Sequence, residues 1–493
     1  MKCRLEAIRP APLAACLGAV FGLAAHATVS ASTTHVITSC DDGATAATTP
    51  GTLRYEILHA MQTDAINVSN ISVVCGTSYL TLYEGEIPIT QSALAIYGSG
   101  STNAIRTIHG RIFKHTGAGT LSISDLTIES GYYSSAYSSN NADGGCIYSA
   151  GNVTLTNASV IDCEARLYKP SSGSPQVRGG AIFAKGKVTL TGSKVSGNLA
   201  DTLYDSLNSP AIEAIGGGIY AGSVSADYST IAGNTALADM GAMAGGVYTH
   251  GSLSATHSTI ADNLSTASFH TSRAGGAFVV GDLTLDSTTV SDNRSNKAGG
   301  IFQGATGHLC TISNSTISGN TAYLNIGGMV LYSPATISNS TIVFNKSSLN
   351  AGGVGTGADV TLRSSIMADN QGGSGNPQDL AIGGTLSGEA NLVMSTNASP
   401  PLGVITVTGE PRLTPLANHG GPTLTHAVLA SSPAIAAGSN PANLPYDQRG
   451  PGFDRKLSIP PPAALTWTDI GAYQRQLVDD EIFYDGLGPL PGG

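Results

Sequence analysis

The stretch GGAFVVGDLTLDSTTVSDN, residues 275–293, decides the fold of this chain, because variants of it recur from Leu121 to Asn370. Most copies open on glycines and close on an asparagine. The closing residues of successive copies are Asn198, Asn234, Asn263, Asn293, Asn320, Asn345 and Asn370. Apolar or small residues stand three, eight and ten places before each asparagine, as Val290, Leu285 and Leu283 do before Asn293. Two copies further upstream keep these columns and carry Gly131 and Cys163 in place of the asparagine.

The repeat predicts a coil of short strands. Two apolar columns lie two residues apart, which is the period of a strand with one buried face. The odd step to the third column requires a bend, and Asp286 and Asn314 stand there; both residue types favour turns. Because one turn cannot bury its own apolar face, stacked turns are required. We therefore expect an all-β, right-handed, single-stranded parallel β-helix with a stacked amide ladder at the asparagine column.

Two points of this prediction stay open. A sandwich of short strands with glycine turns is the alternative fold, although it does not need columns that stay in register. The strand that follows the glycine pair, for example Ala181-Ile182-Phe183, does not reveal which residue points inward.

The composition of the chain limits the classes of function that it can have. The 493 residues include 62 glycines, only 11% are charged, and the formal net charge is −10. An acidic chain without a basic stripe is not expected to bind nucleic acid. Beyond the N-terminus no long apolar run follows, so we expect no transmembrane segment in the mature chain. No metal-ligand spacing is visible, and we expect no metal and no cofactor. The oligomeric state is left open.

The chain divides into five parts. Residues 1–27 resemble an export signal, with basic residues before an apolar run, and cleavage could fall as late as residue 31. A lipoprotein signal ending at Cys16 is the alternative, but most of the apolar run follows that cysteine. Residues 28–115 are expected to form an N-terminal cap and irregular first turns, 116–407 the repeats, 408–475 a C-terminal cap, and 476–493 a tail.

Within the first part of the exported chain, residues 51–61 have helical spacing and could cover the open end of the coil. Segments 71–74, 80–82, 87–89, 94–97 and 106–108 are expected to be early turns of the coil. Export permits disulfides. Cys40 and Cys75 share the N-terminal segment, while the pairing of Cys146 with Cys163 stays open. Cys310 occupies an inward column, where a buried thiol packs well.

Three resemblances support this picture. Residues 51–61, with Leu53, Arg54 and Ile57, resemble the CSLREA-type segment that precedes bacterial β-helix repeats, although Gly51, Tyr55 and Glu56 depart from it. The repeats resemble those of polymorphic outer-membrane proteins, which implies a surface β-helix. The C-terminal motifs, among them 447–450 (DQRG) and 469–473 (DIGAY), resemble proteins called choice-of-anchor Q domain-containing. We expect this region to fold over the last turn and Asp447, Arg449 and Asp469 to pair there.

The linkers between each asparagine and the next glycine pair carry the candidate site. They are long in the first copies and short in the later ones, so the long ones should cluster on one flank. The candidate ligand-binding residues on them are Tyr132, Tyr133, Tyr137, Tyr168, Lys169, Arg178 and Tyr204. Tyrosines with nearby charges can dock on sugars or on a protein, and function often resides on such insertions. Alternatively the linkers only shield the flank.

Catalysis has weaker support in the sequence. Asp262, Asp292 and Asp369 precede the asparagines, but they alternate with uncharged residues and form no paired acidic cluster. His109, His250, His257 and His270 are scattered, and no catalytic residue is assigned. We therefore expect an exported β-helix protein, secreted or on the outer-membrane surface of a Gram-negative bacterium. It would act in adhesion or in glycan or protein binding. A polysaccharide lyase or hydrolase with its site under the same linkers, and a passive envelope protein, are the alternatives.

Overall fold

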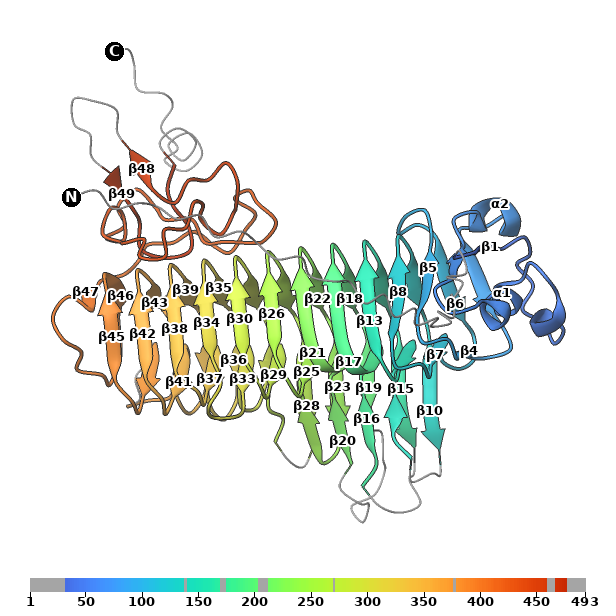
Figure 1. The fold of residues 1–493 in the computed structure, drawn as a ribbon. Coiled ribbons are helices and arrows are strands. Elements are labelled where there is room, and N and C mark those ends of the chain that lie inside the picture. Colours follow the sequence, from blue (N-terminus) through green and yellow to red (C-terminus); the bar gives the residue numbers. More distant parts are fainter. Residues whose placement is uncertain are drawn as a thin grey trace, which may run out of the picture. The chain divides into compact units, whose positions relative to one another are not determined.

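The computed structural model describes residues 32–136, 140–168, 174–202, 212–268, 271–375, 378–458 and 466–476. The predicted parallel β-helix is confirmed: successive turns of the chain, or rungs, pair in parallel and in register along a rod (Figure 1). The expected signal and residues 477–493 of the expected tail lie outside the described residues.

Each rung contributes to two sheets of the rod. The wide sheet contains 22 of the described strands. They are β1 (Thr34–Val36), β2 (Ala65–Asn67), β4 (Ile87–Ile89), β5 (Leu94–Tyr97), β7 (Phe113–His115), β8 (Thr120–Ser124), β12 (Ile147–Ser149), β13 (Asn152–Thr156), β17 (Ile182–Thr191), β21 (Ile219–Asp227), β25 (Val247–Thr249), β26 (Leu253–Thr256), β29 (Ala277–Val279), β30 (Leu283–Asp286), β33 (Ile301–Gln303), β34 (Cys310–Ser313), β37 (Met329–Leu331), β38 (Ala335–Ser338), β41 (Val354–Thr356), β42 (Val360–Arg363), β44 (Leu380–Ile382) and β45 (Leu386–Glu389).

The narrow sheet closes the coil and contains 13 of the described strands. They are β3 (Tyr79–Leu82), β6 (Ala104–Thr107), β9 (Thr127–Glu129), β14 (Ser159–Ile161), β18 (Lys194–Ser196), β22 (Thr230–Ala232), β27 (Thr259–Ala261), β31 (Thr289–Ser291), β35 (Thr316–Ser318), β39 (Thr341–Val343), β43 (Ile366–Ala368), β46 (Asn391–Val393) and β47 (Ile405–Val407). The bend from the wide to the narrow sheet uses left-handed backbone, as at Asn314 (φ 47°), and so does the bend from the narrow sheet to the linker, as at Asp292 (φ 56°).

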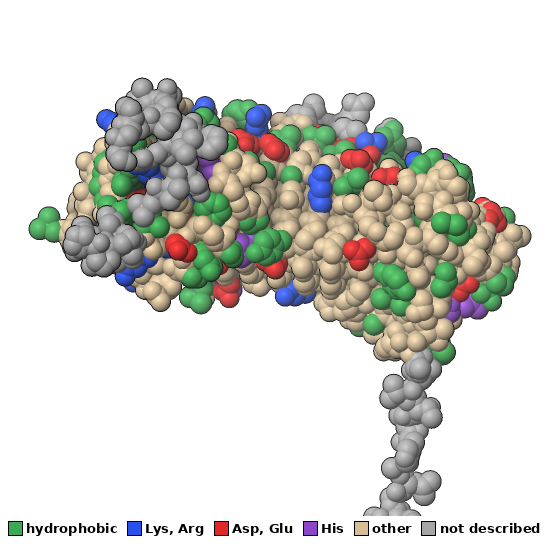
Figure 2. Space-filling view, turned by 90° about the horizontal axis from the view of Figure 1, so that it is seen from above, with side chains coloured by type: hydrophobic (Ala, Val, Ile, Leu, Met, Phe, Trp, Pro, Cys, Tyr) green, Lys and Arg blue, Asp and Glu red, His purple; other side chains and the backbone are tan. Residues whose placement is uncertain are grey.

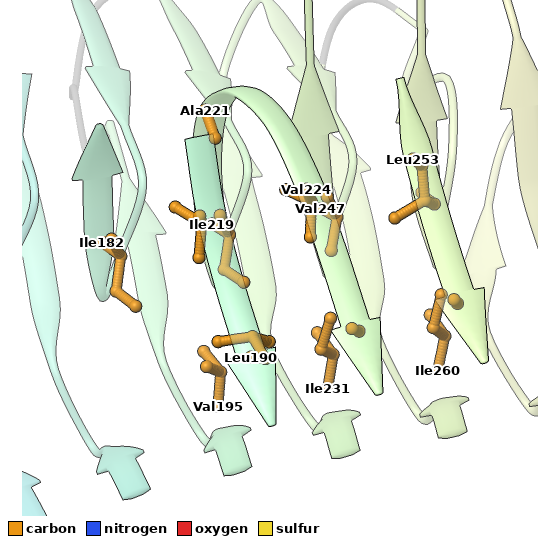
Figure 3. Packing of buried hydrophobic residues seen from close by; sticks show 14 of the residues in the cluster. Ile182, Leu190, Val195, Ile219, Ala221, Val224, Ile231, Val247, Leu253 and Ile260 are labelled. Carbon is orange, nitrogen blue, oxygen red and sulfur yellow. The ribbon is translucent and has the colours of Figure 1, made fainter. Parts of the chain in front are cut away.

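The core fills the inside of the coil with aligned apolar columns. Figure 3 shows Val195, Ile231 and Ile260 from successive rungs one after another, facing side chains of the wide sheet. In the strand after the glycine pair, Ile182 and Ile219 point inward and are fully buried, which settles the register that the sequence left open. Because burying one such side chain contributes roughly 1.5–3 kcal/mol, stacking is what stabilises each rung.

The long linkers are strands as well, and they project from one flank of the rod (Figure 1). An outer parallel sheet contains β10 (Tyr132–Ala136), β15 (Glu164–Tyr168), β19 (Leu199–Asp201), β23 (Thr235–Ala238), β28 (Leu264–Ala267), β32 (Arg294–Ser295), β36 (Thr321–Ala322) and β40 (Lys346–Ser347). An inner sheet contains β11 (Ala142–Asp143), β16 (Gln176–Arg178), β20 (Glu213–Ile215) and β24 (Gly241–Met243). We call the inner sheet together with β10, β15, β19, β23 and β28 the fin.

The fin has a small core of its own. Ala165, Leu167 and Ala200 of the outer sheet pack against Val177 and other small side chains of the inner sheet. The chain then returns to the rod through tight turns such as Gly179, whose φ is +68°. A Cβ there would lie 2.1 Å from the Ile182 carbonyl oxygen, so a side chain is excluded. The linkers expected as loops are therefore an ordered second layer.

Two helices cover the N-terminal end. α1 (Leu53–His59) buries Leu53 and Ile57 within the expected segment 51–61, and Thr52 caps it by accepting a hydrogen bond from the Tyr55 N–H. Segment 71–74, expected as part of an early turn of the coil, lies instead in α2 (Ile71–Cys75), which ends at left-handed Gly76. A short 3₁₀ helix covers Ala46–Thr48, and a disulfide joins Cys40 to Cys75.

The expectation that the C-terminal region folds over the last rung is wrong. It packs along the flank of the rod, against the outer face of the narrow sheet (Figure 1). Gln448 binds Thr289 and Thr316, and Arg455 binds Asn314. Val343, Ile366 and other outward side chains of the narrow sheet are buried there. The short strands of the C-terminal region, β48 (Leu457–Ser458) and β49 (Thr466–Trp467), form an antiparallel pair.

Candidate functional site

The residues predicted to bind a ligand do not gather on one surface. Tyr132 and Tyr168 lie on the outer face of the fin and are 38% and 41% exposed, with Arg166 two residues before Tyr168 on β15. Tyr133 points the other way, and the Arg111 guanidinium lies 3.9 Å from the centre of its ring. Arg178 lies on the inner sheet and faces the rod. Tyr137, Lys169 and Tyr204 lie outside the described residues.

The outer face of the fin carries an ion cluster. The Nε of Arg166 lies 2.7 Å from Glu164, and its Nη2 lies 2.9 Å from Asp201 on the neighbouring strand. Burial raises the pKa of Glu164 above its ordinary value, even though Arg166 opposes the shift. Because these charges satisfy one another, the cluster ties β15 to β19.

On its inner face the fin lies against a column of aromatic rings that rises from the wide sheet. The rings stack with centroids 5.1–5.4 Å apart in the order Tyr148, Phe183, Tyr220, Tyr248, Phe278 and Phe302. Residues of the fin and of later linkers, such as Ile215 and Ala274, pack on them. The faces of the inner rings are thus occupied by their neighbours, and their edges and hydroxyls face the fin.

Arg178 joins the fin to this column. Its guanidinium makes two hydrogen bonds of 2.7 Å to Asp143 and lies beside the rings of Phe183 and Tyr220, 4.7 and 5.3 Å from their centres. Burial disfavours the cation, but the Asp143 carboxylate outweighs it, so the pKa of Arg178 is raised. The arginine therefore stays charged between the inner sheet and the aromatic column.

A neutral proton donor and acceptor pair lies beside this arginine. The Tyr220 hydroxyl lies 2.6 Å from Nε2 of His250. Burial raises the pKa of Tyr220, while burial and the Arg178 charge lower the pKa of His250. At neutral pH the phenol and the imidazole are therefore both uncharged, and either can exchange a hydrogen bond with a ligand.

A hollow of about 240 Å³, which we call the crevice, lies between β24 of the fin and residues 271–273, which lead back to the rod. Glu213, Met243, Thr271 and Arg273 line it. Burial raises the pKa of Tyr248, and the Arg273 charge partly opposes this. Arg273 is exposed and makes no ion pair with the part of the chain that the structure describes. Arg273 thus lines this hollow, and the groups with shifted pKa values, Tyr220, Tyr248 and His250, lie on the neighbouring aromatic column.

The expected amide ladder lies where the linkers leave the rod, and it is fully hydrogen-bonded. In Asn263, Nδ2 donates to Oδ1 of Asn293 at 2.9 Å and to the Ile231 carbonyl at 3.0 Å, while Oδ1 accepts from the N–H and Nδ2 of Asn234. The same contacts repeat from Asn198 to Asn370, where Asp379 ends the ladder. The ladder is buried, so its role is to fix the corner.

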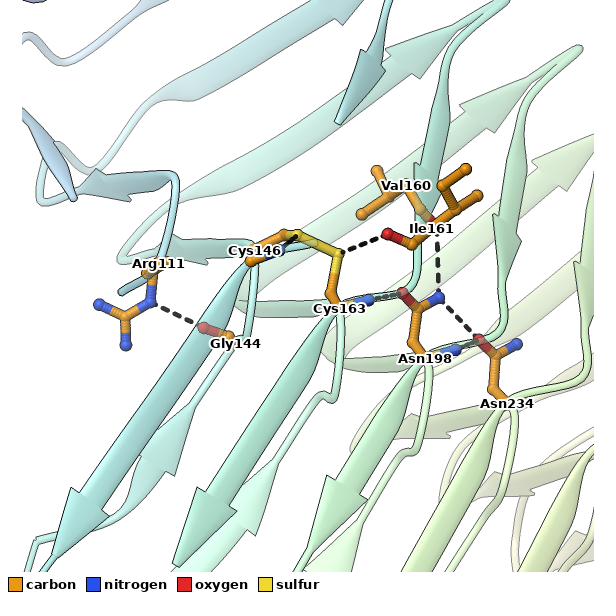
Figure 4. Close-up of a disulfide and its surroundings, with 9 residues drawn as sticks. Arg111, Gly144, Cys146, Val160, Ile161, Cys163, Asn198 and Asn234 are labelled. Carbon is orange, nitrogen blue, oxygen red and sulfur yellow. Dashed lines mark hydrogen bonds between the residues drawn. A yellow bond between two sulfur atoms is a disulfide. The ribbon is translucent and has the colours of Figure 1, made fainter. Parts of the chain in front are cut away.

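A disulfide starts this column, as Figure 4 shows. Cys146 follows a glycine pair and Cys163 stands at the asparagine position, and the two are bonded. The Cys163 N–H donates to Oδ1 of Asn198 at 2.9 Å. The bond thus closes one rung at the base of its linker. Cys310 is free and buried, and burial raises its pKa to about 12, so it is not a nucleophile at neutral pH.

The acidic C-terminal residues hold the fold of that region. Asp447 and Arg449 form a buried ion pair at 2.8 Å. Asp469 instead accepts hydrogen bonds from the backbone N–H groups of Ala436 and Arg475. Arg455 is fully buried, and burial lowers its pKa to about 10. Asp447, Arg449 and Asp469 are therefore all used in contacts that hold the C-terminal region together.

The sequence reasoning missed the aromatic column. Tyr148, Phe183, Tyr220, Tyr248, Phe278 and Phe302 stand at the same place in successive repeats, next to an inward residue. This aligned column was the available signal. His250 was noted only as one scattered histidine, because its partner Tyr220 comes from the preceding rung.

No family model matches the chain, and neither a curated protein nor a solved structure does. Within the described residues, no group of three or more histidine, cysteine or acidic side chains could hold a metal ion. No helix among them is both long and apolar enough to cross a membrane.

Proposed function

We propose that this protein acts outside the cell as a binding protein that holds an acidic polysaccharide in the crevice between fin and rod. The observation that carries the proposal is the hollow at the edge of the fin, where Arg273 makes no ion pair among the described residues, next to the column that holds Tyr248 and His250. Arginine suits carboxylate and sulfate groups, and phenol and imidazole suit hydroxyls. The exposed Tyr132 and Tyr168 form a separate amphipathic surface on the outer face of the fin.

An extracellular location is part of the proposal. Residues 1–27 resemble an export signal, and two disulfides suit an oxidising compartment. The resemblance to polymorphic outer-membrane proteins and to choice-of-anchor Q proteins supports display at, or release from, a bacterial surface. On the face in Figure 2, charged side chains are scattered rather than gathered into a stripe. The hollow lined by Arg273 is therefore a better candidate for ligand capture than that face.

A glycan array with matched variants tests the proposal. Arg273→Ala and His250→Ala remove groups at the opening, and we expect each to weaken binding of acidic glycans about tenfold or more. Arg363→Ala and His257→Ala are the controls, because Arg363 lies on β42 of the wide sheet and His257 at the bend between β26 and β27, both away from the fin. Equal binding by all four variants, or no acidic glycan bound by the unmodified chain, would contradict the proposal.

A polysaccharide lyase is the second candidate, favoured by the Tyr220–His250 pair beside Arg178. In an elimination, His250 would take the proton next to the carboxylate, and Tyr220 would protonate the leaving oxygen as the carbon–oxygen bond breaks. Arg178 would neutralise the carboxylate. Unsaturated products that absorb ultraviolet light, and that vanish in Tyr220→Phe, would establish this activity. If neither binding nor cleavage is found, a passive envelope role remains.

A further inference from the structure

A second opening lies on the C-terminal half of the rod, where the aromatic column ends. The register continues the column from Phe302 through Val330, Gly355 and Ala381. Small side chains replace rings at these places, and the linkers there are short. The result is a groove of about 380 Å³ across successive rungs.

The groove is uncharged. Its polar lining includes Asn325, Asn350, Asn397 and Thr356, with Tyr332 at one side, and no lining residue is acidic or basic. Burying a charged group without a partner is costly, so this lining disfavours an ionised ligand. The lining amides instead offer both donors and acceptors, which suit the hydroxyl groups of a sugar.

The polar groups are held in place. Nδ2 of Asn350 donates to Oδ1 of Asn325 on the preceding rung at 2.9 Å. Oδ1 of Asn397 accepts a hydrogen bond from the Ile382 N–H, and its Nδ2 donates one to the Ile382 carbonyl, both at 2.8 Å. Positioned amides lose less conformational freedom when a ligand binds, so their hydrogen bonds contribute more of their energy to affinity.

Tyr332 supplies an apolar platform. Its side chain is 49% exposed, and its ring meets the edge of Phe302, with centroids 5.5 Å apart. Contact with Phe302 fixes one side of the Tyr332 ring, and the rest of the ring is open to solvent. An aromatic ring beside amide groups fits the alternating C–H faces and hydroxyl edges of a pyranose.

The floor of the groove depends on Gly355. A Cβ there would lie 2.4 Å from Cδ1 of Ile326, so any side chain must displace this isoleucine. The rungs repeat every ~4.8 Å, close to the length of one sugar in an extended chain. A linear chain along the rod would therefore meet equivalent backbone and amide groups at each residue.

We propose that this groove is a binding site for a neutral, linear oligosaccharide, distinct from the charged crevice and independent of the function proposed for it. Tyr332 stacks on one sugar ring, and Asn325 and Asn350 bind hydroxyls. The site selects uncharged chains because nothing in its lining can pair with an ion.

Calorimetric titration of the full chain with neutral oligosaccharides, such as gluco-, manno- and xylo-oligosaccharides, tests this site. We expect binding that does not depend on salt, that Tyr332→Ala weakens about tenfold or more, and that Asn350→Ala weakens several-fold. Tyr332→Phe keeps the ring and should keep most of the affinity. Tyr228→Ala removes an exposed tyrosine elsewhere and is the matched control.

Three results would overturn the proposal: no neutral oligosaccharide binds, Tyr332→Ala leaves the affinity unchanged, or Tyr228→Ala weakens it equally. Acidic chains that compete for the same groove would also contradict it. Arg273→Ala separates the two sites, because it should leave neutral binding intact whether or not the crevice binds acidic glycans. Retained melting temperatures of the variants confirm that folding is not the cause.

Discussion

On the wide sheet, one column of outward-facing residues runs from Tyr148 to Ala381. Its two halves have the same strand backbone but differ in their side chains and in the linkers that cover them. In the N-terminal half, Phe183 and Tyr220 carry large rings, and the fin buries them. In the C-terminal half, Gly355 and Ala381 place no large side chain over the backbone, and the linkers are short. A groove therefore remains there. Side-chain size and linker length, rather than the rungs, thus decide where this rod is covered and where it is open.

The asparagine ladder does not follow this division. It makes the same contacts at Asn263, under the fin, and at Asn345, under a short linker. The corner that anchors every linker is therefore uniform, while the linkers vary. Such an arrangement lets binding surfaces change without loss of the fold.

The largest effect is expected from breaking the ladder. Asn263→Ala and Asn345→Ala each leave several buried donors and acceptors without partners, and we expect a loss of about 4–6 kcal/mol in the free energy of unfolding. Chemical denaturation measures this. Similar losses for both variants would show that the stability of the corner does not depend on linker length. A large loss for Asn263→Ala alone would show that the corner is not uniform along the rod. Asn296→Ala, in a linker, should change stability by about 0.5 kcal/mol or less.

A smaller and unequal effect is expected along the outward column. Tyr248→Ala removes a buried ring that stacks on Tyr220 and Phe278, and should cost about 3–5 kcal/mol. Val330→Ala, at the equivalent place beside the groove, should cost about 1–2 kcal/mol. Both are measured by the same denaturation experiment. Equal costs would mean that the fin adds nothing to the burial of the column.

The end of the ladder should make stability depend on pH. Burial raises the pKa of Asp379 from 3.8 to about 6. Because the folded chain binds this proton more tightly, the contribution to stability is full below pH 3.8 and is lost as the pH rises through about 6. Asp379→Asn removes the titration, so its stability relative to the unmodified chain should rise by up to about 3 kcal/mol between pH 4 and pH 7.5.

A control for this prediction lies nearby. Hydrogen bonds from the backbone and side chain of Thr385 lower the pKa of Asp359, an exposed group. Asp359→Asn should therefore show a weak pH dependence of the opposite sign. Parallel stability curves for Asp379→Asn and the unmodified chain would contradict the account of the ladder's end.

The sequence predicted the rod well because the buried columns must align. The fin was harder to predict. Its core residues, such as Ala165, Ala200 and Ala214, are small and have no strong strand preference. They are ordered because the rungs hold their linkers side by side. Residues 71–74 form an apolar run that periodicity cannot assign to helix or strand.

The C-terminal region and the site show a further limit. Gln448 and Arg455 reach rungs more than a hundred residues earlier, and no local pattern marks such contacts. In the site, Arg178 was predicted from its linker, whereas Tyr220 and His250 meet only because adjacent rungs stack. Sequence reasoning found the flank and missed the pairing of side chains on it.

Hydrogen exchange measured by mass spectrometry on the full chain tests most directly the claim that the fin is a folded second layer enclosing the crevice. Backbone amides in residues 176–178, 213–215 and 241–243 should exchange as slowly as those of the rung strands, because they are hydrogen-bonded in the inner sheet. Exchange of these amides within seconds, as in an open loop, would mean that no fixed crevice exists and would contradict the account.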